Sequence, residues 1–140
     1  MGSISRIKRV LLFLIVLSIL ANSAYSYPII ISNKGVNHKE AKQLVYSIPE
    51  QYYQYVGVIE FVNKPIKKFI WETNNQAEIK YNNGQYWVYW DKHHKCFKGK
   101  ILIYSLTYNV LKHELGHIAD HCVNLVDYST EEFAYNFRIT

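Results

Sequence analysis

Two histidines four residues apart, with a glutamate directly after the first, are the residues of this chain best suited to metal chemistry. They stand in the segment His113-Glu114-Leu115-Gly116-His117. On a helix, residues i and i+4 lie about 40° apart around the axis, so both imidazoles can reach one metal ion. Glu114 lies about 100° from His113, where its carboxylate faces a water molecule and not the ion. The segment therefore predicts a metal site with His113 and His117 as ligands and Glu114 as the catalytic base.

The residues around this segment predict the helix that such a site needs, over about residues 107–124. Glycine inside a helix costs about 1 kcal/mol relative to alanine, so Gly116 favours a close approach there, either by another segment or by the metal site. Asp120 lies about 20° from His113 around the helix, and we predict that it orients a ligand histidine, with a plain surface carboxylate as the alternative. A structural helix with an exposed polar face is the alternative for the whole segment. The core side of the helix is expected to consist of Leu111, Leu115, Ile118, Cys122 and Leu125.

A catalytic zinc site needs a third protein ligand and an open fourth position. Residues 129–137 read Ser-Thr-Glu-Glu-Phe-Ala-Tyr-Asn-Phe. Together with the two histidines, this segment resembles the gluzincin branch of the zincin metallopeptidases, whose third ligand is a glutamate on a following helix. It is similar to the Glu-x-Phe-Ala-x-x-Phe pattern of the catalytic domain of anthrax lethal factor and related small peptidases. In that pattern the ligand stands three residues before the alanine, which is Glu131 here; Glu132, about 100° away around the helix, is the alternative.

The resemblance, which covers about residues 113–137, implies a zinc-dependent endopeptidase with Zn²⁺ as its cofactor and a peptide or protein as its substrate. Related enzymes often add a tyrosine or histidine that donates a hydrogen bond to the oxyanion. Tyr128 is the candidate nearest to Glu131, with His121 as the second choice, whereas the position of the corresponding lethal-factor tyrosine holds Asn124. A strand expected over residues 101–104 precedes the helix, where zincins keep an edge strand that binds extended peptide.

Other classes of zinc protein fit the sequence less well. The metzincin branch places a glycine three residues, and a histidine or aspartate six residues, after the second histidine; Asp120 and Val123 stand there and exclude it. Peptide deformylase takes a cysteine ligand from a Glu-Gly-Cys-Leu segment, which the surroundings of Cys96 do not match. A catalytically weak or inactive zinc-binding accessory protein is the alternative of a different class. Glu114 argues against it, because a structural site needs no carboxylate there.

The first 26 residues predict a secretory signal peptide or a signal anchor. Three basic residues precede an apolar run at residues 10–21, and Ala24-Tyr25-Ser26 fits a cleavage site before Tyr27. The run is shorter than the roughly 20 residues that cross a bilayer as a helix, which favours cleavage, although a membrane tether through residues 10–24 stays open. In both cases residues 27–140 are expected to form one domain that is secreted or anchored outside the cytoplasm.

The net charge of +5 does not indicate a nucleic-acid-binding protein, because its excess lies in the leader. From Tyr27 onward, 13 basic residues stand against 11 acidic ones, and no nucleic-acid partner is expected. Cys96 and Cys122 are the only cysteines. In an oxidising compartment they can form one disulfide, while two free thiols are the alternative. The oligomeric state is not indicated.

The remaining pattern predicts a small α+β domain, in which a mostly antiparallel sheet packs beside the metal-site helix and a C-terminal helix. We expect a helix over residues 38–47 with Asn37 as its cap, and a last helix capped by Thr130. Asn82-Asn83-Gly84 predicts a β-hairpin between the two strands that flank it. Strands are expected over residues 29–31, 58–62, 77–81, 85–90 and 101–104.

Overall fold

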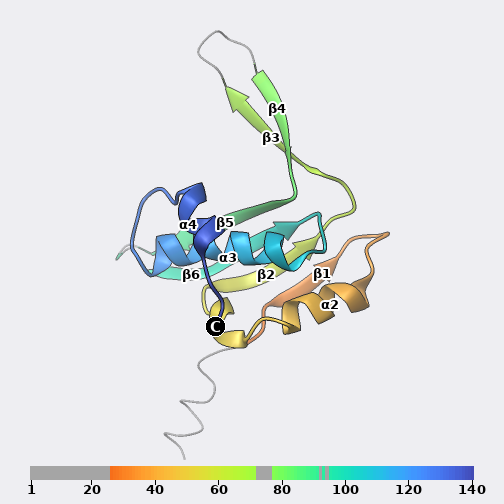
Figure 1. The fold of residues 1–140 in the computed structure, drawn as a ribbon, viewed down its shortest axis with the longest axis horizontal. Coiled ribbons are helices and arrows are strands. Elements are labelled where there is room, and N and C mark those ends of the chain that lie inside the picture. Colours follow the sequence, from red (N-terminus) through yellow and green to blue (C-terminus); the bar gives the residue numbers. More distant parts are fainter. Residues whose placement is uncertain (1–25, 72–76, 92, 94) are drawn as a thin grey trace, which may run out of the picture.

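A four-stranded mixed sheet supports the helix that carries both histidines (Figure 1). In the computed structural model, which describes residues 26–71, 77–91, 93 and 95–140, the strand order is β1-β2-β6-β5. β1 pairs in parallel with β2, β2 in parallel with β6, and β5 in antiparallel fashion with β6. The bounds are Ile29–Ser32 for β1, Val56–Phe61 for β2, Gly84–Trp90 for β5 and Cys96–Ile103 for β6.

The small α+β domain is therefore confirmed, but the prediction of a mostly antiparallel sheet is wrong. Helix α2 (His38–Tyr46) and a short 3-10 turn (Glu50–Tyr53) lie between β1 and β2 in the chain. A crossover of this length brings the chain back to the starting edge of the sheet, so β2 runs parallel to β1. Only β5, which reaches β6 through a short loop, forms an antiparallel pair within this sheet.

One face of the sheet packs against helices α2 and α3, where α3 spans Tyr108–Cys122. The alternation of β2 and β6 explains which face is buried, since Ile59 and Phe61 on β2 and Ile101 and Ile103 on β6 are fully buried. Residues between them, such as Glu60 and Lys100, point to the other face and form an ion pair there. The apolar side of α3 completes the same core, through Leu111, Leu115, Ile118 and Cys122.

The hairpin predicted around Asn82-Asn83-Gly84 does not form. Strand β4 (Ala77–Asn82) pairs instead with β3 (Ile66–Trp71) in a separate two-stranded ribbon. This ribbon extends away from the sheet (Figure 1). Asn83 connects the ribbon to β5, and its carbonyl accepts a hydrogen bond from the backbone N–H of Tyr104 beyond the end of β6. Both strands next to the Asn-Gly pair thus find better backbone partners elsewhere in the chain.

The predicted helix starts are confirmed by their side-chain caps. The Asn37 side chain accepts hydrogen bonds from the backbone N–H groups of Lys39 and Glu40 at the start of α2. The Thr130 hydroxyl accepts one from Phe133 at the start of α4 (Glu131–Asn136). The cap fixes the point at which α4 begins, and therefore the position of its first residue, Glu131.

A disulfide between Cys96 and Cys122 joins the first residue of β6 to the last residue of α3, with the two Cα atoms 5.5 Å apart. Of the two alternatives left by the sequence, the structure has the paired one. The end of the metal-site helix is thereby fastened to the central part of the sheet.

The predicted leader, apart from Ser26, lies outside the described residues. In the part of the chain that the structure describes, no helix is long and apolar enough to span a bilayer.

Candidate metal centre

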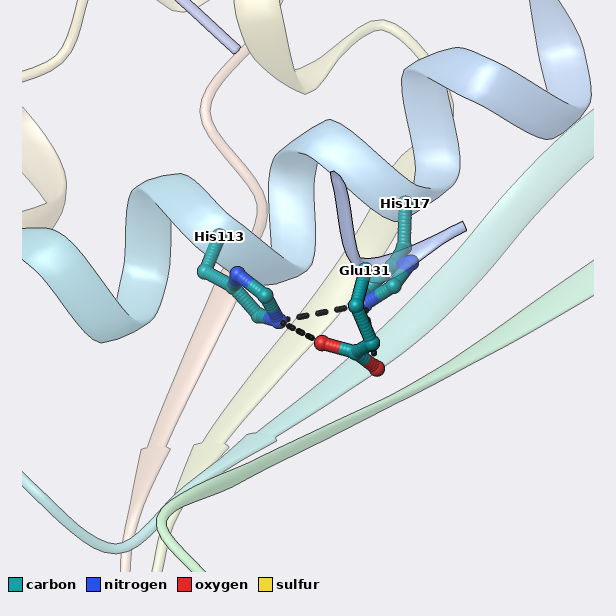
Figure 2. A group of neighbouring side chains, drawn as sticks. All are labelled: His113, His117 and Glu131. Carbon is teal, nitrogen blue, oxygen red and sulfur yellow. Dashed lines mark hydrogen bonds and ion pairs between the residues drawn. The ribbon is translucent and has the colours of Figure 1, made fainter. Parts of the chain in front are cut away.

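Three side chains from two helices converge on one point, as Figure 2 shows. The Nε2 atoms of His113 and His117 on α3 lie 3.1 Å apart. The Glu131 carboxylate on α4 reaches both rings, with 3.0 Å from one oxygen to His113 Nε2 and 3.4 Å from the other to His117 Nε2. The three residues predicted as metal ligands are therefore the three that the fold brings together.

The donor set and its spacing fit zinc. Ligand atoms on a tetrahedron about 2.0–2.1 Å from a central Zn²⁺ lie about 3.3 Å from one another. The observed separations of 3.0, 3.1 and 3.4 Å lie around this value. Two imidazoles and one carboxylate also form a ligand set of catalytic zinc sites, in which the fourth position stays free for water or substrate.

Glu131 reaches the histidines because α4 packs directly on the middle of α3. A Cβ atom added at Gly116 would lie 2.9 Å from Phe137 Cβ and 3.0 Å from Ala134 Cα. Glycine is thus required for the observed contact, as the sequence predicted. Both glutamates are exposed, but Glu132, the alternative ligand, does not belong to the converging group.

His117 is oriented by a chain of hydrogen bonds that starts at Asp120. The Asp120 carboxylate is 6% exposed and accepts from the Asn124 amide and the Ser129 hydroxyl. Burial raises the pKa of Asp120, but these bonds and one from the Thr130 backbone outweigh it and hold the pKa below its usual value. Because Ser129 donates to Asp120, its oxygen accepts from His117 Nδ1, 2.9 Å away. The proton of neutral His117 then lies on Nδ1, and the lone pair of Nε2 points at the metal position.

The prediction that Asp120 orients a ligand histidine thus corresponds to an arrangement in the structure, although Ser129 stands between the two. Such outer partners fix the tautomer and the ring orientation of a ligand. Burial also lowers the pKa of His117, which favours the neutral imidazole that a metal requires.

Tyr86 on β5 packs against one face of the His117 ring. Its ring stacks on the imidazole with 4.8 Å between the ring centroids and 15° between the planes. The Tyr86 hydroxyl lies 3.0 Å from His121 Nε2, and His121 Nδ1 donates to the Val126 carbonyl at 2.8 Å. Both nitrogens of His121 are therefore engaged in holding Tyr86 and the loop after α3. His121 does not line the cavity beside the metal ligands.

His113 is held differently, by ring packing against Tyr135 of α4 with the ring centroids 4.6 Å apart. Its Nδ1 atom is buried and has no hydrogen-bond partner among the described residues. A buried donor without a partner costs about 1–3 kcal/mol. Metal-ligating histidines usually donate from this second ring nitrogen, so His113 is held less firmly than His117.

Glu114 stands beside the ligands and is 6% exposed. Burial, with a smaller contribution from the Glu131 charge, raises the pKa of Glu114 to about 8, while Lys68 acts in the opposite direction. The start of β5 lies directly against this carboxylate, because a Cβ atom added at Gly84 would be 2.4 Å from Glu114 Oε1. A carboxyl group in this environment can both accept and release a proton near neutral pH.

A cavity of about 430 Å³ opens in front of these groups. Its walls are the first half of α3, Glu131 and Tyr135 of α4, residues 82–86 before and along β5, and Lys68 of β3. The cavity therefore borders an edge strand of the sheet. The structure assigns this edge to β5 and not to residues 101–104, since β6 is covered on both sides by β2 and β5.

Tyr128, predicted as the oxyanion donor, does not reach the cavity. Its side chain is 89% exposed and does not line the cavity walls. It precedes the turn in which Ser129 and Thr130 bond to α3 and α4, and this turn directs it outward. Nearness to Glu131 in sequence was its only support, and the fold corrects that prediction.

Four residues of the site were not found in the sequence: Lys68, Gly84, Tyr86 and Ser129. Gly84 was interpreted as a turn residue, although its role is the close approach to Glu114. Tyr86 lies in the strand expected over residues 85–90, where its residue type gives no sign of a contact with His117. Ser129 stands two residues before the ligand Glu131, and this was its only signal.

Comparisons with protein-family models, curated proteins and solved structures give no significant match for this chain.

Proposed function

We propose that this chain is a zinc-dependent endopeptidase with a small gluzincin-like domain. The observation that supports this most directly is the convergence of His113, His117 and Glu131 within 4.8 Å of one another, next to a buried glutamate that has no part in the ligand set. A purely structural zinc site is usually closed by four protein ligands, whereas three ligands and a cavity are typical of catalysis.

The residues divide the chemistry between them. Bound zinc supplies acidification of water and polarisation of the scissile carbonyl. Glu114 accepts a proton from the attacking water and delivers it to the leaving amine nitrogen. Ser129 and Asp120 keep His117 in the ligating tautomer.

A peptide substrate is expected to lie along β5. Among the described residues, no strand pairs with the outer edge of β5, and its first residues form a wall of the cavity. An extended peptide can add to such an edge by main-chain hydrogen bonds, which places one peptide bond over the ligands. We also propose that the protein acts outside the cytoplasm, as the leader and the Cys96–Cys122 disulfide favour.

The first experiment separates catalysis from metal binding at Glu114. Glu114→Gln keeps the shape of the side chain but removes the base. We expect the variant to bind one zinc per chain, as the wild type does, and to lose at least 100-fold in kcat/KM on a casein-derived peptide mixture. Zinc is counted by atomic spectroscopy, and hydrolysis by mass spectrometry. Equal hydrolysis by both proteins would contradict the mechanism. Equal zinc without hydrolysis by either would favour the non-catalytic zinc-binding alternative.

The second experiment tests the third ligand with a matched control on the neighbouring residue. Glu131→Ala is expected to lose stoichiometric zinc, because only two ligands remain. Glu132→Ala removes the same group one position later on α4 and is expected to keep it, since Glu132 is outside the ligand group. Zinc loss in the second variant but not in the first would assign the ligand to Glu132.

A further inference from the structure

Lys68 is the one lysine or arginine among the described residues that line the cavity. It lies on β3, two residues after Ile66, which is buried against the domain. Alternate residues of a strand point to the same face, so Lys68 shares the inward face with Ile66. Lys67, between them, points to the opposite face and does not line the cavity. The ribbon thus presents one of two adjacent lysines to the site.

The Lys68 ammonium is available for a ligand. Its charge acts on Glu114, but no carboxylate of the described residues forms an ion pair with it. Several neighbouring wall residues, such as Asn82, Asn83 and Asn109, are uncharged amides. Amides can bind a peptide backbone, but they do not neutralise a cation.

The charge balance of the loaded site favours an acidic group. A divalent ion outweighs the single negative charge of its ligand Glu131. The positive charge of Lys68 balances the negative charge of Glu114. The cavity with its divalent ion would therefore carry a net charge of about +1. A carboxylate next to Lys68, whose side chain is exposed at the cavity wall, would compensate this excess.

We propose that Lys68 determines specificity by binding a carboxylate of the substrate close to the scissile bond. The inference rests on the proposed peptidase function and names its substrate class, which is acidic peptides. The carboxylate can belong to an aspartate or glutamate side chain or to the C-terminus of a short peptide. Amidation of the peptide abolishes the preference only if the C-terminal carboxylate is the group that binds.

The experiment uses a peptide library randomised around a central segment, prepared with free and with amidated C-termini. We expect the wild type to cleave peptides with an acidic group at one position near the cut about fivefold faster, in kcat/KM, than their Asn or Gln counterparts, as for a partly exposed ion pair. Lys68→Glu is expected to remove this preference or to turn it toward Lys and Arg. Lys67→Glu makes the same change in net charge on the outward face and should keep the wild-type preference.

A binding measurement keeps the inference separate from the proposed function. Zinc-loaded Glu114→Gln protein, with and without Lys68→Glu, is titrated with fluorescent Asp- and Asn-containing peptides. Preferential binding of the acidic peptide that depends on Lys68 supports the inference even where the wild type hydrolyses nothing, a result that would reject the peptidase alone. Three results overturn the inference: no acidic preference in binding or cleavage, an equal effect of both lysine variants, or a uniform loss of activity on all peptides with Lys68→Glu. The last result would mean that Lys68 serves only to tune Glu114.

Discussion

At the scale of single residues, the two ligand histidines are held by different means. His117 donates from Nδ1 to Ser129, which in turn donates to the buried Asp120, and its ring is stacked on Tyr86. Apart from the contacts of its Nε2 with His117 and Glu131, His113 packs its ring against Tyr135, and its Nδ1 has no partner among the described residues. A metal bound here would therefore be positioned mainly by His117, and His113 would have more freedom to adjust.

This asymmetry predicts that Ser129 matters for metal affinity although it touches no metal. Ser129→Ala removes the acceptor of His117 Nδ1 and leaves Asp120 with one fewer donor. We expect zinc affinity to fall by about 10- to 100-fold, as for other outer partners of zinc ligands. Competition with a chromophoric chelator measures this affinity at fixed pH.

Ser47→Ala is the matched control, since the Ser47 hydroxyl donates to the Leu44 carbonyl at the end of α2, in another part of the chain. This variant should keep wild-type zinc affinity. An unchanged affinity in Ser129→Ala would show that Tyr86 stacking alone orients His117.

The convergence of His113, His117 and Glu131 was predictable from sequence, because the spacing and helical phase of these residues are local properties of two short helices. The supporting residues were not. Ser129 lies in a loop whose path depends on Leu125, which has a positive φ of 57°. Tyr86 and Lys68 reach the site through strand pairings that local sequence does not specify. The prediction for Tyr128 was wrong for a similar reason, since Tyr128 is close to Glu131 in sequence but does not line the cavity.

At the scale of elements, two glycines let neighbouring segments lie against α3 on either side of the metal ligands. Gly84 brings β5 against Glu114, and Gly116 brings α4 against the helix backbone. The same substitution at these positions should therefore disturb different functions. At Gly84 the obstacle is the end of a flexible side chain, whereas at Gly116 it is the backbone of α4.

Gly84→Ala is expected to push the Glu114 carboxylate aside and leave the ligands in place. Zinc affinity should stay within about twofold, while kcat/KM falls by about 100-fold, the usual effect of a misplaced catalytic group. Gly116→Ala is expected to displace α4 and Glu131. Overpacking of about 1–3 kcal/mol outweighs the gain in helix propensity of about 1 kcal/mol, so both stability and zinc affinity should decrease.

Urea unfolding, chelator competition and peptide hydrolysis, measured on both variants, distinguish these effects. Equal losses of zinc affinity in the two variants would mean that β5 and α4 do not act separately on the site.

Among the elements, sequence patterns predicted the helix ends but not the pairing of the strands. Helix ends were predicted within one or two residues, because caps such as Asn37 and Thr130 act on the next three residues. Strand partners were not, because Asn82-Asn83-Gly84 suits a hairpin but β6 and β3 compete for the same backbone groups. Parallel pairing of β1, β2 and β6 depends on the crossover and leaves no local signature.

At the scale of the whole molecule, the sheet, the core and the metal-site helix meet at the Cys96–Cys122 disulfide. Cys122 is both the last residue of α3 and a member of the main core, and Cys96 begins β6. The crosslink closes a loop with a sequence separation of 26 residues. This loop contains all of β6 and all of α3, which together provide a central strand of the sheet and the two histidines of the candidate site.

The disulfide is expected to stabilise the fold and not to shape the metal site. Closing a loop of this length lowers the entropy of the unfolded chain by the equivalent of about 3–4 kcal/mol, a large part of the roughly 5–15 kcal/mol typical of a domain. The Cys96→Ala/Cys122→Ala variant should thus lose about that much unfolding free energy in metal-free urea titrations, and wild type reduced in the absence of metal should behave alike. Its folded fraction should bind zinc within a few-fold of wild type, because His117, Ser129 and Glu131 keep their contacts. A variant that kept its stability but lost zinc as strongly as Ser129→Ala would reverse this assignment. That result would mean that the crosslink helps to position the metal ligands, through His121, which stands next to Cys122.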